Sequence, residues 1–247
     1  MYAHRAAKLG KRDHKIDVFV TEALFTTVTN VNFDAARIEA LLRKAAEVKK
    51  KAHKLYEQAA TESGNLAETL AGPAQWEPAA DRAGLVAEGR EIGIQTRLTA
   101  AGPDVTGLQE LLTYGLKGTA AYADHAMVLG KEDPAVYAFF HEALDFLTHK
   151  HPTVDQLLGM NLKCGEVNLQ VMGLLDGANT GAYGHPVPTK VRVEPLKGHA
   201  ILVSGHELKD LEELLKQTEG KGINVYTHGE MLPAHGYPEL KKHKHLV

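Results

Sequence analysis

The stretch AILVSGHELKDLEELLKQTEGKGINVY, residues 200–226, has the pattern of a strand, a helix and a second strand. The short apolar run at 200–204 is typical of a buried parallel strand. Residues 207–220 repeat leucine every three or four positions, which predicts an amphipathic helix closed by glycines. The run INVY, residues 223–226, predicts the second strand. Such a unit should have parallel strands and a right-handed crossover.

Two possible metal ligands follow these strands. His206 comes directly after the first strand and Glu230 shortly after the second. Parallel strands bring both residues to the carboxyl edge of the sheet, where open α/β sheets bind ligands. An imidazole nitrogen and a carboxylate oxygen could therefore serve one metal centre. The alternatives are that His206 caps the following helix and that Glu230 is a solvated acid.

The loop THGEMLPAHG also suggests zinc, with His228 and His235 beside Glu230. Its spacing matches no standard zinc motif, and Pro233 argues against a helical H-E-x-x-H arrangement. The sequence favours zinc only weakly.

In the residues before this unit, apolar side chains recur every three or four positions, which is the spacing of helices. An a/d-like pattern runs through 35–60, where Asn32 or Asp34 can cap the first turn. Further helices are predicted at 81–100, 107–129, 134–148 and 153–175. Glycines and prolines make 176–190 an irregular boundary. The fold class is thus mainly α: a helical-bundle domain at 1–190, then the start of a parallel, Rossmann-like α/β domain at 191–247.

Several of these helices have explicit start signals and core candidates. Asp133 precedes Pro134, a common helix start, and Thr153 is the expected N-cap of the helix after it. The apolar face of that last helix is predicted to include Val154, Leu157, Leu158, Leu162, Val167 and Val171.

Composition excludes some classes of protein. The chain has 247 residues and a formal net charge of −3, which argues against a nucleic-acid binder. No apolar run reaches the roughly 20 residues that span a bilayer, so no membrane role is expected. The single cysteine, Cys164, forms no internal disulfide and is expected to pack as a small apolar residue. These features favour a reducing compartment, the cytoplasm. The histidines at 243 and 245 are expected on a solvated face.

The C-terminal 47 residues, from ILVSGHELKDL to KKHKHLV, resemble the hybrid cluster protein family, also called prismane proteins or hydroxylamine reductases. The stretches TTVTNVNFD (26–34), YGLKGTAAYADHA (114–126) and GEVNLQVMGLLDGANTGAYGHPVPTKV (165–191) support the resemblance in the same order. It covers essentially the whole chain.

The resemblance implies a helical N-terminal domain, two α/β domains, and a hybrid iron–sulfur–oxygen cluster between them. It implies that His206, in SGH, and Glu230, in HGEML, ligate iron of that cluster. The implied activity is reduction of N–O compounds: of hydroxylamine to ammonia, and of nitric oxide. The expected partners are a small nitrogen-oxide substrate and an external electron donor.

The sequence departs from the family at both ends. It has no cysteine-rich N-terminal stretch for a cubane cluster, which needs about four thiolates. The further cluster cysteines, second glutamate and lysine that the family places well beyond the glutamate loop are also absent from this sequence. We therefore expect a fragment, a split-gene product or a remnant, completed by missing C-terminal domains or a complementing chain and inactive alone. The competing hypothesis is a non-catalytic fragment or helical scaffold without a cluster.

Overall fold

The computed structural model describes residues 1–28 and 34–247. Its backbone contacts divide the chain into two compact units. The first, the helical unit, consists of residues 1–124 and 133–171. The second, the strand-containing unit, consists of residues 125–132 and 172–247. The predicted domain boundary at residue 190 stays a prediction.

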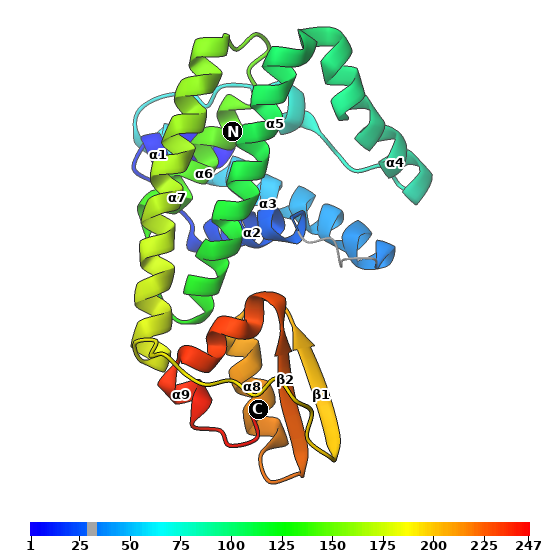
Figure 1. Ribbon diagram of the computed structural model, residues 1–247. Coiled ribbons are helices and arrows are strands. Elements are labelled where there is room, and N and C mark those ends of the chain that lie inside the picture. Colours follow the sequence, from blue (N-terminus) through cyan, green and yellow to red (C-terminus); the bar gives the residue numbers. More distant parts are fainter. Residues whose placement is uncertain (29–33) are drawn as a thin grey trace. The chain divides into compact units, whose positions relative to one another are not determined.

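The first 183 residues supply helices and no strand in the part that the structure describes (Figure 1). In chain order these are α1 (Tyr2–Lys8), α2 (His14–Thr26), α3 (Ala35–Glu62), the 3-10 turn η1 (Gly72–Gln75), α4 (Arg82–Glu91), α5 (Ile94–Val128), α6 (Pro134–Phe146) and α7 (Val154–Tyr183). The predicted break at Gly102–Pro103 is a kink inside α5, where Gly102 has φ 79°. A positive φ suits glycine because it has no Cβ.

Aspartate begins most of these helices. The Asp34 carboxylate accepts hydrogen bonds from the backbone N–H groups of Ala36 and Arg37 at the start of α3. Asp13, Asp81 and Asp133 do the same for α2, α4 and α6. These bonds satisfy N–H groups that have no partner within a helix. Asp34 is thus a confirmed cap, whereas Asn32 lies outside the described residues.

The core of the helical unit lies where α5, α6 and α7 pack. A Cβ on Gly115 of α5 would lie 3.0 Å from the Cys164 sulfur of α7, so the missing side chain allows the close approach. Cys164 is buried, as expected, and burial raises the pKa of its thiol. The other buried residues of this core are Leu112, Leu116, Ala120, Ala123, Val136, Tyr137, Phe139, Phe140, Ala143, Val167 and Val171.

A polar pair crosses the interior of the same unit. Asp17 of α2 and His141 of α6 are both buried, and the Asp17 Oδ1 lies 2.6 Å from the His141 Nε2. Each group therefore has a partner that offsets the cost of removing it from water.

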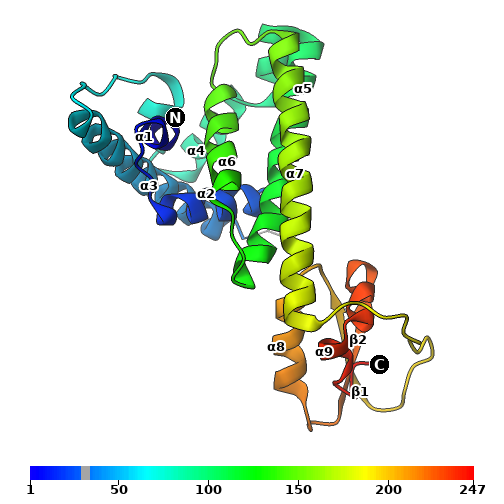
Figure 2. The ribbon, with the colours of Figure 1, turned by 90° about the vertical axis from the view of Figure 1, so that its left-hand side faces the viewer.

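Within the strand-containing unit, β1 (His199–Ser204) and β2 (Ile223–His228) form a parallel pair joined through α8 (Leu208–Thr218). The register pairs Ile201 with Val225 and Ser204 with His228. The 3-10 segment η2 (Gly229–Gly236) and the short helix α9 (Pro238–Lys241) follow. Figure 2 shows α8 alongside the two strands. The predicted class, mainly helical with a parallel strand–helix–strand unit, is confirmed.

The two faces of this sheet differ. The leucines Leu208, Leu211 and Leu215 of α8 share a core with Val225 of β2. On the other face, Leu202 is 69% exposed. The Tyr226 hydroxyl, on that face, accepts a hydrogen bond from the Leu196 N–H at 2.7 Å. The incoming segment therefore covers only part of this face.

The last three residues pair with β2 on the side away from β1. The Val225 N–H donates to the His245 carbonyl, and the Val247 N–H donates to the Val225 carbonyl. Leu246 forms a parallel bridge with Val225. The expectation that His243 and His245 lie on a solvated face was wrong: His243 is buried, and the His245 Nε2 lies 2.9 Å from the Thr218 hydroxyl. The backbone pairing of residues 245–247 with Val225 holds this segment against the unit although its composition is polar.

Two further expectations need correction. Residues 176–183 are not irregular, because α7 continues to Tyr183 and buries Ala178 and Tyr183 despite its glycines. Packing here outweighs weak helix propensity. Val154, Leu158 and Leu162, predicted on the apolar face, are exposed on α7. None of the described helices is long and apolar enough to span a membrane.

Candidate metal centre

His206 and Glu230 meet at the carboxyl edge of the two-stranded sheet. The His206 Nε2 lies 2.6 Å from the Glu230 Oε2. Because Ser204 and His228 are paired in register, each candidate stands two residues beyond the end of its strand. The side chains leave from neighbouring strand ends about 4.8 Å apart. Whether they bind iron stays a prediction.

Backbone geometry directs Glu230 toward His206. Gly229, the residue after β2, has φ 59°, which turns the chain sharply into η2. Within η2, Met231 and Ala234 are buried in the core of the unit. The Gly236 carbonyl accepts a hydrogen bond from the Val187 N–H at 2.8 Å. Glu230 is thus an exposed side chain on an anchored loop.

The competing roles for His206 and Glu230 can be compared with their contacts. The N-cap of α8 is Glu207, and no side chain makes a capping hydrogen bond there. His206 therefore does not cap that helix. Both side chains are more than half exposed, and each makes a polar contact with the other. Atoms at this distance can share a proton, and both are of types that can also bind a metal ion.

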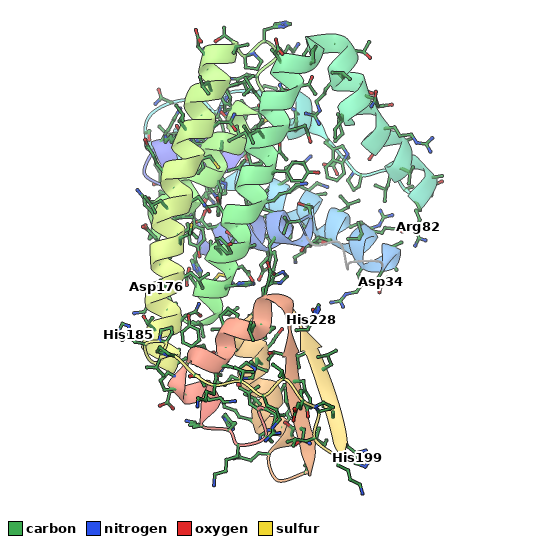
Figure 3. The ribbon with its side chains drawn as sticks, in the orientation of Figure 1. Asp34, Arg82, Asp176, His185, His199 and His228 are labelled. Atoms are coloured by element: carbon green, nitrogen blue, oxygen red, sulfur yellow. The ribbon has the colours of Figure 1, made fainter. Side chains whose placement is uncertain are left out.

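Two more histidines lie near this pair. The His228 Nδ1, at the end of β2, lies 3.2 Å from the Ser204 hydroxyl. Figure 3 labels His228 at the opposite end of the sheet from His199, which begins β1. The His125 ring, in the last turn of α5, has its centroid 6.4 Å from that of His206. Burial lowers the pKa of His125, and the charge of His206 lowers it further, while Asp210 opposes the shift.

His235 faces the interior instead. Its side chain is buried, with Nε2 2.9 Å from the Thr227 hydroxyl and Nδ1 3.3 Å from the Lys241 ammonium. The three zinc candidates thus have separate partners: His228 contacts Ser204, His235 contacts Thr227, and Glu230 contacts His206. Among residues 1–28 and 34–247, no group of three or more His, Cys, Asp or Glu side chains is placed to hold a metal ion.

The donor set suits part of a mixed-ligand iron centre. One imidazole nitrogen and one carboxylate oxygen at a common point fit two positions of such a centre. The remaining positions need donors beyond those that the described residues bring together. The two donor types suit two positions of such a centre, and the ligand role of the pair stays a prediction.

Sequence reasoning identified the pair and missed its surroundings. The strand–helix–strand pattern placed His206 and Glu230 at one edge. His125 comes from a helix some 80 residues earlier, and no local spacing connects it with His206. Ser204 and His228 could have been found from the parallel register, since both are the last residues of their strands.

The fold and the pair define the class of protein: a mainly helical chain with a parallel strand–helix–strand unit and a histidine–carboxylate pair at the carboxyl edge of its sheet, the edge at which open α/β sheets bind ligands. All of the chain, residues 1–247, matches the Prismane/CO dehydrogenase family, and the chain belongs to this family.

Curated relatives agree with this assignment. The chain is 56% identical over 246 residues to a hydroxylamine reductase of Rhodospirillum rubrum. The alignment covers 100% of this chain and 45% of that relative. It is 52% identical to a hydroxylamine reductase of Syntrophobacter fumaroxidans and 48% identical to one of Methanocella arvoryzae. The chain therefore spans less than half the length of these relatives.

Proposed function

We propose that this chain is part of an oxidoreductase that reduces N–O compounds at a hybrid iron–sulfur–oxygen cluster. In this proposal, His206 and Glu230 ligate iron of that cluster. The substrate is hydroxylamine, which is reduced to ammonia, and nitric oxide is a second possible substrate. The observation that carries the proposal is the 2.6 Å approach of the His206 Nε2 to the Glu230 Oε2.

The chemistry of the pair supports this role. Reduction of hydroxylamine adds two electrons and two protons, breaks the N–O bond and releases ammonia and water. When bound, the cluster supplies the electrons and harder iron sites that accept a nitrogen–oxygen group. His206 and Glu230 hold their part of it through a nitrogen and an oxygen donor. The buried core of the strand-containing unit fixes the strand ends from which both side chains extend.

The proposed partners include further polypeptide, because the relatives are more than twice as long as this chain. The remaining ligands come from missing C-terminal domains or a complementing chain, because this chain spans 45% of the Rhodospirillum rubrum relative. An external donor supplies the electrons. The exposed Leu202 lies on the sheet face that we expect the remaining polypeptide to cover. We place the complete enzyme in the cytoplasm.

The experiment uses the complete protein with its cluster. We expect His206→Ala and Glu230→Ala each to lower iron content, to change the electron paramagnetic resonance spectrum of the hybrid cluster and to abolish hydroxylamine reduction. His199→Ala is the matched control because His199 is a histidine at the other end of β1. Unchanged spectra and rates in both site variants would refute the ligand roles.

A second function remains to be tested against the first. The described residues bring only two donors together, which favours a non-catalytic scaffold when the chain is alone. The test is iron and acid-labile sulfide in the purified chain. A colourless, iron-free chain supports the scaffold role for this chain in isolation, whereas stoichiometric iron and sulfide contradict it.

A further inference from the structure

His235 connects the Glu230 loop to two neighbouring elements. It lies in η2, five residues after Glu230, and its side chain is 1% exposed. The Nε2 lies 2.9 Å from the Thr227 hydroxyl on β2. The Nδ1 lies 3.3 Å from the ammonium of Lys241 on α9. That ammonium also donates to the Leu246 carbonyl at 2.9 Å.

The partners determine the protonation of the ring. A Lys ammonium has donors only, so the His235 Nδ1 must accept from Lys241. The Nε2 then carries the hydrogen and donates it to the Thr227 hydroxyl. The bond accepted by Nδ1 requires a neutral imidazole. Burial lowers the pKa of His235 and the Lys241 charge lowers it further, in agreement with the neutral ring.

We propose that His235 is a positioning residue, which holds the η2 loop so that Glu230 faces His206. This inference rests on the proposed ligand role of Glu230 for its functional meaning. The structural part, the fixing of η2 by His235, stands on the three hydrogen bonds alone.

The other contacts of η2 do not replace these bonds. Met231 and Ala234 anchor the segment through apolar packing, which is non-directional, and the hydrogen bond from the Val187 N–H to the Gly236 carbonyl holds its last residue. Hydrogen bonds fix direction as well as distance. The His235 ring bonds β2 on one side and α9 on the other, and Lys241 extends the connection to the residues that pair with Val225. The ring thus ties the loop to β2 and α9, and Lys241 continues the connection to Leu246.

The test uses three variants and one matched control. His235→Leu removes both bonds while filling the space, Thr227→Val removes the Nε2 partner, and Lys241→Met removes the Nδ1 partner. Lys242→Met is the control because Lys242 is the next residue, is exposed and pairs with Glu239. Hydrogen exchange of residues 229–236 is measured in this chain. The spectrum of the hybrid cluster and the KM and kcat for hydroxylamine are measured in the complete protein.

We expect His235→Leu to speed exchange in 229–236 about tenfold, with smaller effects for the two partner variants. Lys242→Met should match the wild type. In the complete protein, the three variants should shift the cluster spectrum and lower kcat more than they raise KM. Should His235→Leu fail to fold, Thr227→Val and Lys241→Met give the answer.

Two outcomes overturn the inference. Exchange in 229–236 that stays at the wild-type rate in all three variants shows that His235 does not fix the loop. Faster exchange with an unchanged cluster spectrum shows a merely structural residue. If instead Glu230→Ala and His206→Ala leave the spectrum unchanged, the proposed function fails, and the exchange result still decides whether His235 holds η2.

Discussion

Asp124 on α5 is a carboxylate that the fold partly removes from water near a second carboxylate. Burial raises its pKa to about 6, and the charge of Glu22 contributes to the shift. An acid whose pKa is raised on folding favours the folded state only where it is protonated, below its unfolded pKa of about 4. That contribution is lost as the pH rises through 6.

We therefore expect Asp124→Asn to stabilise the chain above pH 6. At pH 8 the free energy of unfolding should rise by up to about 1 kcal/mol, because solvent screens a partly exposed charge. Below pH 4 the variant should show no gain. Thermal unfolding at pH 4 and pH 8 measures this, with Asp104→Asn, an exposed position on α5, as the control. Equal gains at both pH values would contradict the assignment.

Residue-level chemistry was partly readable from the sequence. Asp34, Asp133 and Thr153 were predictable because capping depends on local spacing. In α7 the Gln156 N–H donates to the Thr153 hydroxyl, and the Thr153 N–H donates to the Gln156 side chain. The contacts of His235 and His125 were not predictable, since they join residues that only tertiary packing brings together.

At the scale of elements, α8 and β2 carry the core of the strand-containing unit. Leu211 is fully buried with Leu215, Val225 and Met231. Leu202, on β1, is largely exposed on the opposite face. The pattern of apolar residues predicted both elements, yet it could not show which face of the sheet is covered.

We expect Leu211→Ala to destabilise the strand-containing unit by about 3 kcal/mol, because it removes buried methyl groups and leaves a cavity. Leu202→Ala should cost about 0.5 kcal/mol or less, as an exposed side chain loses little on truncation. Urea unfolding followed by hydrogen exchange of residues 199–247 compares the two. A similar cost for both variants would show that the two faces of the sheet are buried to the same extent.

Helices with a sustained repeat or a clear start signal were easier to predict than the first two helices. Residues 35–60 gave a sustained repeat, and α3 extends over Ala35–Glu62. Helices α1 and α2 were not predicted, because their stability comes from packing: Tyr2, Ala6 and Ile16 are buried in one cluster with residues of α3. The end of α7 was missed because its glycines were given more weight than tertiary contacts.

At the scale of the whole molecule, α7 has an exposed apolar stripe within the helical unit. Leu158, Leu162 and Leu169 are exposed and share one face of the helix by their spacing. The sequence predicted Leu158 and Leu162 as core and did not single out Leu169, because apolar periodicity does not show which side of a helix is covered. Stripes of this kind mark interaction sites or promote association.

We expect the purified chain to bind a hydrophobic dye and to associate as its concentration rises. A double variant, Leu162→Lys with Leu169→Lys, should lower both effects several-fold while leaving the circular dichroism spectrum unchanged. Analytical ultracentrifugation at several concentrations measures the association. Glu166→Lys, an exposed position on the same helix, controls for added charge. If the double variant associates as strongly as the wild type, the exposed leucines of α7 do not cause the association.

The bonds between Val225 and residues 245–247 bear on how the chain is handled in the laboratory. The Val225 N–H and carbonyl are both bonded to the terminal segment, so those few residues shield the inner strand from solvent. A chain expressed only to residue 244 would leave this edge of β2 unpaired. Such an edge tends to pair with the strands of other copies of the chain. A purification handle therefore belongs at the amino end, or after a flexible spacer beyond Val247.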